Sequence, residues 1–305
     1  MTRTTHGAFI QVIQISGAIL PLFLPCNISA AIANPAAPVD GSQALALSPS
    51  AQSASDEGRA SRETADPGES RPMIMSTLDA IRDYGVAPLT WNSWQWMTVA
   101  GVLGATAVTW QYDVKLTQAL SGGDARKAWL TQSMPTVSNL GQGATEAVYA
   151  AALYGISYGI GGSRLRTTSG EALQALAVSG VYSEVFKYVA WSNRPSENPD
   201  AHHLFDYSQR SMGMPSGHSF SAFAMAEVYG DEYGRWWTYP LACLIAYSRI
   251  YNRAHYTTDV LVGTALGIAD GIQVRKMSAK AGPPLFHWGF ASVDSAPLLT
   301  AGLSF

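Results

Sequence analysis

The stretch MPSGHSFSAFAMAEVY, from Met214 to Tyr229, sets the pattern for the whole chain. A turn that contains Pro215 and Gly217 leads into an alanine-rich apolar run, which is typical of the start of a buried helix. Similar runs, separated by Gly, Pro or Asn, recur along the chain, and no strand-like alternation competes with them before the C-terminal tail. They are Met97–Trp110, Gly143–Ile160, Glu171–Ala190, Trp236–Tyr247 and Thr258–Val274. The sequence therefore predicts an all-α protein, a helical bundle of about six core helices.

The N-terminal segment, residues 1–33, has the features of a secretory signal peptide. An apolar stretch from Ala8 to Leu24 follows Arg3, and Ala31-Ile32-Ala33 has the small-x-small pattern of a cleavage site. Lipoprotein processing at Cys26 and an uncleaved anchor helix are the alternatives. We therefore expect an exported protein of the periplasm or cell envelope.

Two segments flank the predicted helical domain, which spans residues 76–280. Residues 34–75 are rich in Ala, Ser and Pro without apolar periodicity, so we interpret them as a disordered linker. In the tail, residues 281–305, apolar and small or polar residues alternate from Leu299 to Phe305, and Asp294–Pro297 can turn the chain. This pattern predicts a small C-terminal β-hairpin that packs on the bundle.

The composition excludes some classes of partner. Charged residues make up 13% of the chain and the formal net charge is −3, with no run of basic residues. A nucleic-acid partner is excluded on this ground, because binding to a phosphate backbone needs clustered Lys and Arg. Charged residues interrupt most apolar runs before they reach the roughly 20 residues of a membrane-spanning helix, which favours a soluble or peripherally membrane-bound bundle. Cys26 and Cys243 provide neither a disulfide framework nor metal-ligand spacing.

The first segment with chemical potential runs from Lys187 to Pro195. Lys187 lies near the end of a predicted helix, and Pro195 stops its continuation, which places Arg194 on the exit loop. A point charge and a planar guanidinium at this spacing can converge on one anion. Taken alone, the pattern is better explained by ordinary surface charges.

The second segment is the turn Met214–Ser219. Ser216 and Gly217 can present a hydroxyl and free N–H groups at a helix N-terminus, which is a ready anion site. His218 follows them with a side chain suited to proton transfer near neutrality. A plain helix start is the alternative for this turn alone.

The third segment runs from Ser248 to Asp259. His255 and Asp259 are four residues apart, so on a helix they lie on one face. A carboxylate there can hold one imidazole nitrogen as N–H and leave the other as a nucleophile. Arg249 adds a further cation, and a structural His–Asp pair is the alternative.

Together the three segments resemble the motifs of the type 2 phosphatidic acid phosphatase family. Lys-x6-Arg-Pro, Pro-Ser-Gly-His and Ser-Arg-x5-His-x3-Asp occur in this order between Lys187 and Asp259. The superfamily also includes bacterial non-specific acid phosphatases and vanadium haloperoxidases. The resemblance covers the predicted helical domain but neither the linker nor the tail. Met214 stands where many members have Arg before the second motif, which leaves the binding of a second phosphate or polar head group unsupported.

The resemblance implies a role for each motif residue. His255 would attack phosphorus and form a phosphohistidine, Asp259 would orient it, and His218 would protonate the leaving oxygen and later activate water. The substrate-binding residues would be Lys187, Arg194, Arg249, Ser216 and Gly217. The implied enzyme is a metal-independent phosphatase without a cofactor, acting on phosphomonoesters or pyrophosphates. Lipid phosphates are the first expectation for its substrate, and small soluble phosphoesters are the second.

Two other functions fit the same residues. A vanadate-dependent haloperoxidase would use the same oxyanion site with vanadium on His255, whereas in a phosphatase vanadate would occupy that site as an inhibitor. A non-catalytic envelope lipid-binding protein on the same scaffold is the third hypothesis.

The remaining candidates receive structural interpretations. We expect His202 and His203 to be exposed loop residues without a specific role, and Glu184 to pair with Lys187 three residues later.

Overall fold

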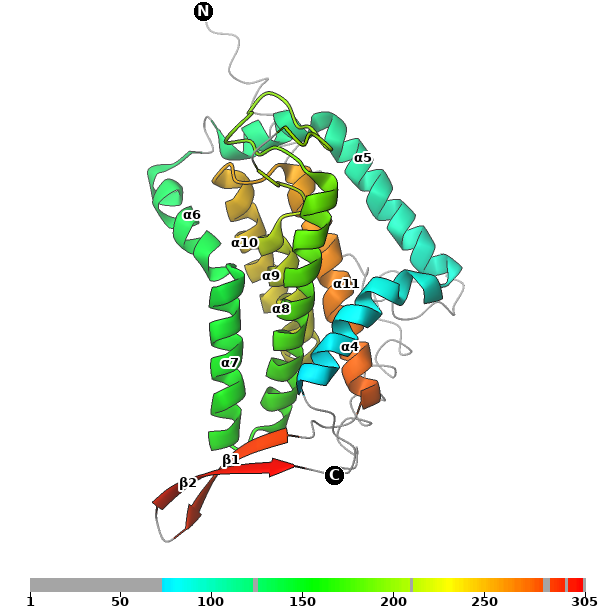
Figure 1. Cartoon of the computed structure of the whole chain (residues 1–305). Helices are drawn as coiled ribbons and strands as arrows, with labels where there is room; N and C mark the ends of the chain where they lie inside the picture. Colours follow the sequence, from blue (N-terminus) through cyan, green and yellow to red (C-terminus); the bar gives the residue numbers. More distant parts are fainter. Residues whose placement is uncertain (1–72, 123–125, 209–210, 282–285, 294–295, 304–305) are drawn as a thin grey trace, which may run out of the picture.

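The computed structural model describes residues 73–122, 126–208, 211–281, 286–293 and 296–303. The predicted signal peptide, 1–33, and the predicted linker up to residue 72 lie outside the described residues. The chain from Met73 onward forms a bundle of α-helices that ends in a two-stranded sheet (Figure 1). The prediction of an all-α bundle with a small C-terminal hairpin is confirmed.

Each of the predicted runs corresponds to one helix, although the run Gly143–Ile160 extends one residue past the end of its helix. The helices are α4 (Met73–Val86), α5 (Ser93–Ser121), α6 (Ala128–Leu140), α7 (Gly143–Gly159), α8 (Ser163–Ala190), α9 (Gly217–Tyr233), α10 (Arg235–Tyr251) and α11 (Thr257–Ala281), with a 3-10 turn, η2 (Ala87–Thr90), after α4. The sequence pattern missed α4 and α6. Pro135 inside α6 obscured its helical pattern, because proline removes a backbone donor and normally interrupts a helix.

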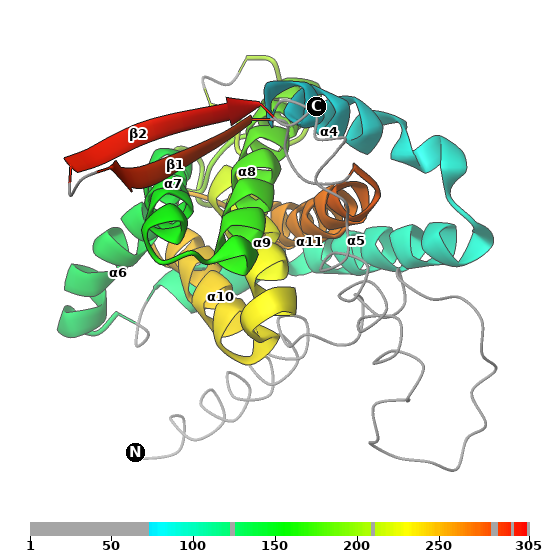
Figure 2. The ribbon, with the colours of Figure 1, turned by 90° about the horizontal axis from the view of Figure 1, so that it is seen from below.

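Helix α9 is the centre of the bundle. All residues from Ser219 to Gly230 are buried, and α8, α10 and α11 surround the helix in the view along the bundle (Figure 2). Apolar side chains of α9 reach two clusters: Phe223 packs with residues of α10 and α11, and Val228 packs with residues of α8. A helix that is covered on all sides lacks the polar stripe of a surface helix, which explains the continuous apolar run in the sequence.

The packing of α11 against α9 depends on three glycines spaced one helical turn apart. A methyl group on Gly263 would lie 2.5 Å from the carbonyl oxygen of Ser216, and one on Gly271 would lie 2.6 Å from the Cβ of Glu227. At Gly267 the added carbon would overlap the carbonyl oxygen of Phe220. The backbones of α9 and α11 are therefore so close at these positions that only glycine fits between them.

The C-terminal hairpin consists of β1 (Phe286–Val293) and β2 (Ala296–Leu303). They pair antiparallel, from Phe286 opposite Leu303 to Val293 opposite Ala296. Ala296 and Pro297, which the sequence analysis assigned to a turn, already belong to β2. Strand β1 contacts α7, and the hairpin lies at the lower end of the bundle in Figure 1. Among the described helices, none is both long and apolar enough to cross a lipid bilayer.

The glycine contact makes a prediction about stability. We expect Gly267→Ala to lower the free energy of unfolding by about 1–3 kcal/mol, because the methyl group forces two backbones apart in a packed core. Gly101→Ala, on exposed α5 where an added carbon meets nothing, is the matched control. It should be neutral or stabilise the protein by up to about 1 kcal/mol, since alanine is the better helix former. Urea denaturation measures both; equal effects would contradict the close packing.

Candidate active site

The structure brings the three predicted segments together at one end of the bundle, the upper end in Figure 1. The backbone N–H of Ser216 donates to the carbonyl of Asp259 at 3.0 Å, which joins the second segment to the third. A carbon placed on Gly217 would lie 3.5 Å from the ammonium nitrogen of Lys187, so the second segment lies next to the first. All eight predicted site residues therefore belong to one cluster.

The predicted turn forms the start of α9. Ser216 is the N-cap residue, and its hydroxyl accepts from the N–H of Ser219 at 3.4 Å and from the hydroxyl of Ser219 at 3.1 Å. Gly217 is the first residue of the helix. The positive end of the helix dipole thus points toward Lys187.

Two arginines lie close together without carboxylate partners among the described residues. The pKa of Arg249 is lowered to about 10, because burial and then the charge of Arg194 disfavour its cationic form. Each guanidinium keeps a buried Nε without a hydrogen-bond partner in the described part of the chain. Arg249 also donates to the hydroxyl of Ser138. Two like charges held side by side need an anion between them.

Lys187 completes the cationic group, which we call the phosphate cradle (Lys187, Arg194 and Arg249). Its ammonium is 2.6 Å from the carboxylate of Glu184, as the spacing predicted. The Glu184 side chain is 57% exposed and that of Lys187 only 16%. An exposed pair of this kind is weak and readily exchanged, so Lys187 can turn to a bound anion.

Ser183 is a candidate that the sequence interpretation missed. Its hydroxyl is buried without a hydrogen-bond partner in the described structure, and it lies 3.0 Å from the position of a carbon added to Gly217. Ser183 precedes Lys187 by one helical turn, so the i, i+4 spacing was the signal that could have revealed it. A buried, unpaired hydroxyl beside the start of α9 is suited to bind an anion there.

His255 lies just before α11, and its orientation differs from the expectation. Its Nδ1 is 2.8 Å from the carbonyl oxygen of Gly213 and 3.6 Å from the carboxylate of Asp259. A carbonyl only accepts, so Nδ1 carries the hydrogen and Nε2 keeps its lone pair. The carbonyl of Gly213 is the hydrogen-bond acceptor that we had expected Asp259 to be.

Asp259 instead caps the helix that follows His255. Its Oδ2 accepts from the N–H of Tyr256 at 2.9 Å, which is the N3-to-N-cap half of a capping box. The next two N–H groups of α11 are bound by α5: Thr257 donates to Thr117 and Thr258 to Asp113, both at 3.0 Å. The start of α11, and with it His255, is therefore fixed by side chains far away in the sequence.

Both site histidines are uncharged at neutral pH. Burial lowers the pKa of His255, and the cradle arginines lower it further, whereas Asp259 opposes the shift. The pKa of His218 falls to about 3, because burial and then the charges of Arg249, Lys187 and Arg194 disfavour its cation, as would a proton on the neighbouring His255. An unprotonated His255 is the nucleophilic form.

The prediction that His202 is an exposed loop residue is wrong. Its side chain is 2% exposed, and its Nε2 lies 3.4 Å from Oδ1 of Asp259. The local sequence could not predict this burial, because the rings and the carboxylate that cover His202 come from α5 and from the start of α11.

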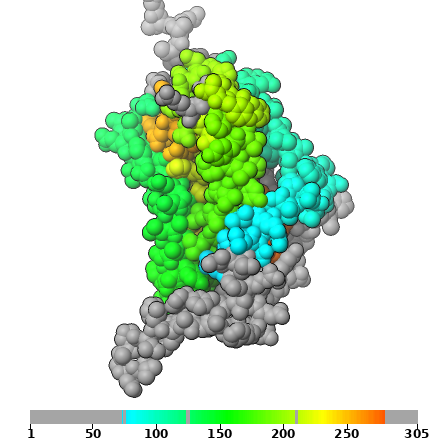
Figure 3. Space-filling model, viewed as in Figure 1, coloured from blue at the N-terminus to red at the C-terminus, as the bar shows by residue number. Residues whose placement is uncertain are grey.

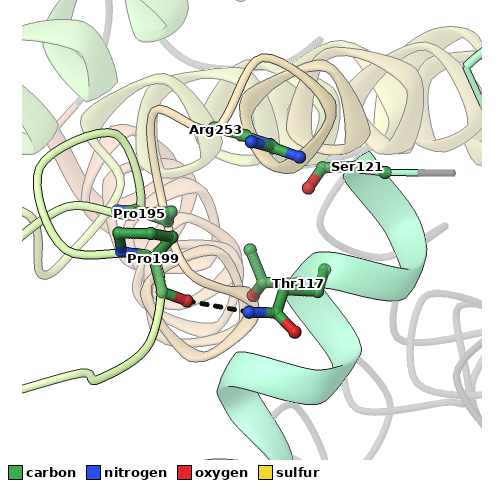
Figure 4. Close-up of a pocket in the computed structure, with 7 residues that line it drawn as sticks. Thr117, Ser121, Pro195, Pro199 and Arg253 are labelled. Carbon is green, nitrogen blue, oxygen red and sulfur yellow. Dashed lines mark hydrogen bonds between the residues drawn. The ribbon is translucent and has the colours of Figure 1, made fainter.

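A small pocket of about 300 Å³ lies beside these elements (Figure 4). Pro195 and Arg253 line it, and they are neighbours in sequence of Arg194 and His255, but none of the eight predicted site residues lines the pocket. Across it the side-chain amide of Gln118 donates to the carbonyl of Pro199 at 3.1 Å. Within the described residues, no group of three or more His, Cys, Asp or Glu side chains is arranged to hold a metal ion.

Three cations at the N-terminus of a central helix, next to two uncharged histidines, form an arrangement suited to bind phosphate-like anions. Residues 170–282 match the model of the PAP2 superfamily. This match confirms the resemblance drawn from the three motifs, over the part of the chain that contains all of them.

Two curated proteins of Porphyromonas gingivalis are similar to parts of the chain. A lipid A 4'-phosphatase is 28% identical over 113 residues, which cover 34% of this chain and 48% of that protein. A lipid A 1-phosphatase is 43% identical over 63 residues, covering 19% of this chain and 14% of that protein. The chain thus spans about half the length of the first relative and less of the second.

Two solved structures are also similar. Aquifex aeolicus LpxE has 23% sequence identity and a TM-score of 0.43, over 54% of this chain and 94% of that one. A transmembrane PAP2 type phosphatidylglycerolphosphate phosphatase from Bacillus subtilis has 21% identity and a TM-score of 0.47, over 60% of this chain and 94% of that one.

The low pKa of His218 predicts a response to anions. Sulfate carries the charge of a phosphate dianion without titrating near neutrality. A bound sulfate offsets the cationic charges that lower the pKa of His218, so this pKa should rise from about 3 by roughly one unit or more. Binding then takes up a proton, and sulfate affinity should increase as the pH falls. NMR titration of the ring measures the onset of protonation, with the exposed His203 as internal reference.

The control for this titration is sodium chloride at the same ionic strength, which screens charges without filling the cradle. An identical titration of His218 in saturating sulfate and in chloride would show that no anion binds beside this ring.

Proposed function

We propose that the protein is a phosphatase that removes phosphate from lipids through a phosphohistidine on His255. One observation carries the proposal: the Gly213 carbonyl binds Nδ1 of His255, which leaves the lone pair of the neutral ring on Nε2, and Arg249 and Arg194 act on the same ring. A nucleophile needs a lone pair, and the phosphoryl group needs cations around its oxygens. The site supplies both within one buried cluster.

In the first proposed step, Nε2 of His255 forms a bond to phosphorus while the bond to the ester oxygen breaks. His218 donates a proton to that leaving oxygen, and the phosphoryl group stays on His255. Bound substrate raises the proton affinity of His218 for this task, because its negative charge offsets the cations that lower the pKa of the empty site.

In the second proposed step, a water molecule attacks phosphorus and the N–P bond breaks. His218, now neutral, accepts a proton from that water, and inorganic phosphate leaves. The carboxylate of Asp259 at 3.6 Å stabilises the positive charge that His255 carries while it is phosphorylated. The three cations of the cradle, with Ser216, Gly217 and Ser183, hold the phosphoryl oxygens in both steps. In this proposal no metal or other cofactor is needed to balance the charge.

Two features favour a lipid as the substrate. The curated relatives that match the core act on lipid A, according to their names. Large apolar side chains are also exposed on the helices of the bundle, among them Val148 and Ile156 of α7 and Val185 and Val189 of α8. Helices α7 and α8 form much of the face seen in Figure 3. We propose that these exposed apolar side chains contact lipid while the exported protein works in the cell envelope.

The covalent mechanism predicts a trapped intermediate. A brief reaction of wild-type protein with a labelled substrate, quenched without acid, should leave acid-labile, base-stable phosphate on the chain. His255→Ala should abolish turnover and labelling but still bind vanadate, because the cradle cations remain. His203→Ala, with an exposed ring outside the cluster, is the matched control and should keep both. Turnover that persists in His255→Ala, or wild-type turnover without label, would contradict the covalent step.

The substrate proposal is tested separately with a panel in one detergent buffer that contains EDTA. Lipid A, phosphatidate and a small chromogenic phosphoester are compared by kcat/KM, with His255→Ala to subtract contaminating activity. We expect the lipids to exceed the small ester by about tenfold or more, because each buried methylene adds close to 1 kcal/mol of binding. A small ester that reacts as well as the lipids would favour soluble phosphoesters as substrates.

A further inference from the structure

His202 is held between two aromatic rings. The ring of Trp110, from α5, stacks on one face at 4.1 Å between centroids with an interplanar angle of 26°. The ring of Tyr256, from the start of α11, stacks on the other at 4.0 Å and 17°. With both faces covered and only 2% of the side chain exposed, the imidazole can interact with the rest of the protein only through its edges.

Both ring nitrogens of His202 face a buried carboxylate. Nδ1 is 2.6 Å from Oδ2 of Asp113, and Nε2 is 3.4 Å from Oδ1 of Asp259. Asp113 also accepts from the N–H and the hydroxyl of Thr258. An ionised carboxylate only accepts hydrogen bonds, so two such neighbours require a hydrogen on each nitrogen. The geometry is that of an imidazolium cation between two anions.

The contact with Asp259 has no substitute within the described structure. Oδ1 of Asp259 and Nε2 of His202 are both buried, and neither has a hydrogen-bond partner there, so their 3.4 Å ion pair is the contact that each makes. The other oxygen, Oδ2, is occupied by the N–H of Tyr256 and lies near His255. His202 is therefore the charge that faces the free side of the carboxylate beside the proposed nucleophile.

We propose that His202 is a positioning residue, a protonated imidazolium that links Asp113 to Asp259 and keeps Asp259 ionised and oriented beside His255. This inference rests on the proposed phosphatase function for its catalytic consequence, but the charge state of His202 does not. His202 touches neither the phosphate cradle nor the reacting atoms in this assignment; it acts through Asp259.

The charges explain why such a residue is needed. Asp113 and Asp259 are almost completely buried, and two buried carboxylates close together cannot both stay ionised without a cation. With His202 protonated, the three groups carry a net charge of −1 next to a histidine that becomes positive when phosphorylated. Without that cation, Asp259 would take up a proton and lose its attraction for the phosphorylated ring.

The proton affinities agree with this arrangement. Burial lowers the pKa of His202, but the hydrogen bonds and charges of Asp113 and Asp259 outweigh it and raise the pKa to about 9. Burial alone would raise the pKa of Asp259, yet His202 and then His255 hold it below its usual value. The other titratable group that faces His202 is the Tyr256 phenol, whose pKa burial raises to about 12, so it stays neutral.

The sign of the pH effect follows from the depressed pKa of Asp259. Its carboxylate is charged above that pKa, and its contribution is lost as the pH falls through it. Removal of His202 raises this pKa, so the acid limb of the kcat–pH profile moves to higher pH. A role confined to packing would change the stability of the loop without moving that limb.

The experiment compares His202→Gln with His203→Gln, the matched control at the exposed neighbouring position. We expect His202→Gln to lower kcat on a chromogenic phosphoester by about tenfold to a hundredfold, the size of effect that loss of an outer partner has at metal-binding histidines. KM and vanadate affinity should change less than about threefold, and the acid limb should move up by about one unit or more. His203→Gln should match wild type in all of these.

Asp113→Asn is the second variant, because the amide is nearly isosteric and can still accept from the N–H of Thr258. It should lower the pKa of His202 from about 9 and move the acid limb in the same direction as His202→Gln. If His202→Gln fails to fold, this variant alone decides the catalytic part. An unchanged kcat and an unchanged acid limb in the variant that folds would overturn the proposal.

A measurement without turnover separates this inference from the proposed function. The 15N shifts of the imidazole nitrogens of His202 in wild type at pH 7.5 should show both nitrogens protonated, and Asp259→Asn should lower the pH at which the second proton is lost. A neutral His202 at this pH would overturn the inference whatever the activity. If wild-type protein hydrolyses no phosphoester, the proposed function fails, and these NMR signals still decide the charge state and its dependence on Asp259.

Discussion

The close approach of α9 and α11 is the constraint on which the site depends. Gly263 lies against the carbonyl of Ser216, at the very start of α9, and the N–H of Ser216 in turn donates to the carbonyl of Asp259. These contacts therefore fix the first turns of α9 and α11 relative to each other. Since His218 is in the first turn of α9 and His255 immediately precedes α11, the spacing of the two proposed catalytic histidines is set by backbone contacts and not by flexible loops.

The charged groups of the cluster are separated by sign: cations lie on one side of His255 and carboxylates on the other. On one side lie the cations of the cradle, of which Arg194 and Arg249 lack carboxylate partners in the described structure, and burial strengthens their effect by lowering the local dielectric. On the other side, the buried carboxylates Asp113 and Asp259 lie around His202. His255 is therefore influenced by the cations of the cradle and by the carboxylate of Asp259. An arrangement of this kind disfavours a positive His255 when the cradle is empty and tolerates it once an anion has neutralised the cations, which is the change that a covalent phosphoryl transfer requires.

Local sequence determined the helices and the motifs to a large extent. Apolar runs bounded by Gly, Pro or Asn identified α5 and α7 to α11, because each is a continuous segment whose propensity and burial agree. α4 was missed, and α6 was missed because Pro135 contradicts the helical pattern that tertiary packing nevertheless maintains. The sequence alone also showed no sign that the glycines of α11 matter for packing. Their role depends on α9, whose backbone occupies the space that a side chain would otherwise fill.

At the site, the sequence by itself determined which residues gather, since the order and spacing of the three motifs brought all eight into one prediction. Only the tertiary structure decided how they are connected. The carbonyl of Gly213, 42 residues from His255, accepts the hydrogen bond expected of Asp259. Asp113 reaches His202 across 89 residues, and Asp259 reaches it from the far side of the site. A histidine in a polar loop has the same local sequence whether it is exposed or held between two carboxylates, because its partners come from other helices, and only their packing decides which charges it meets.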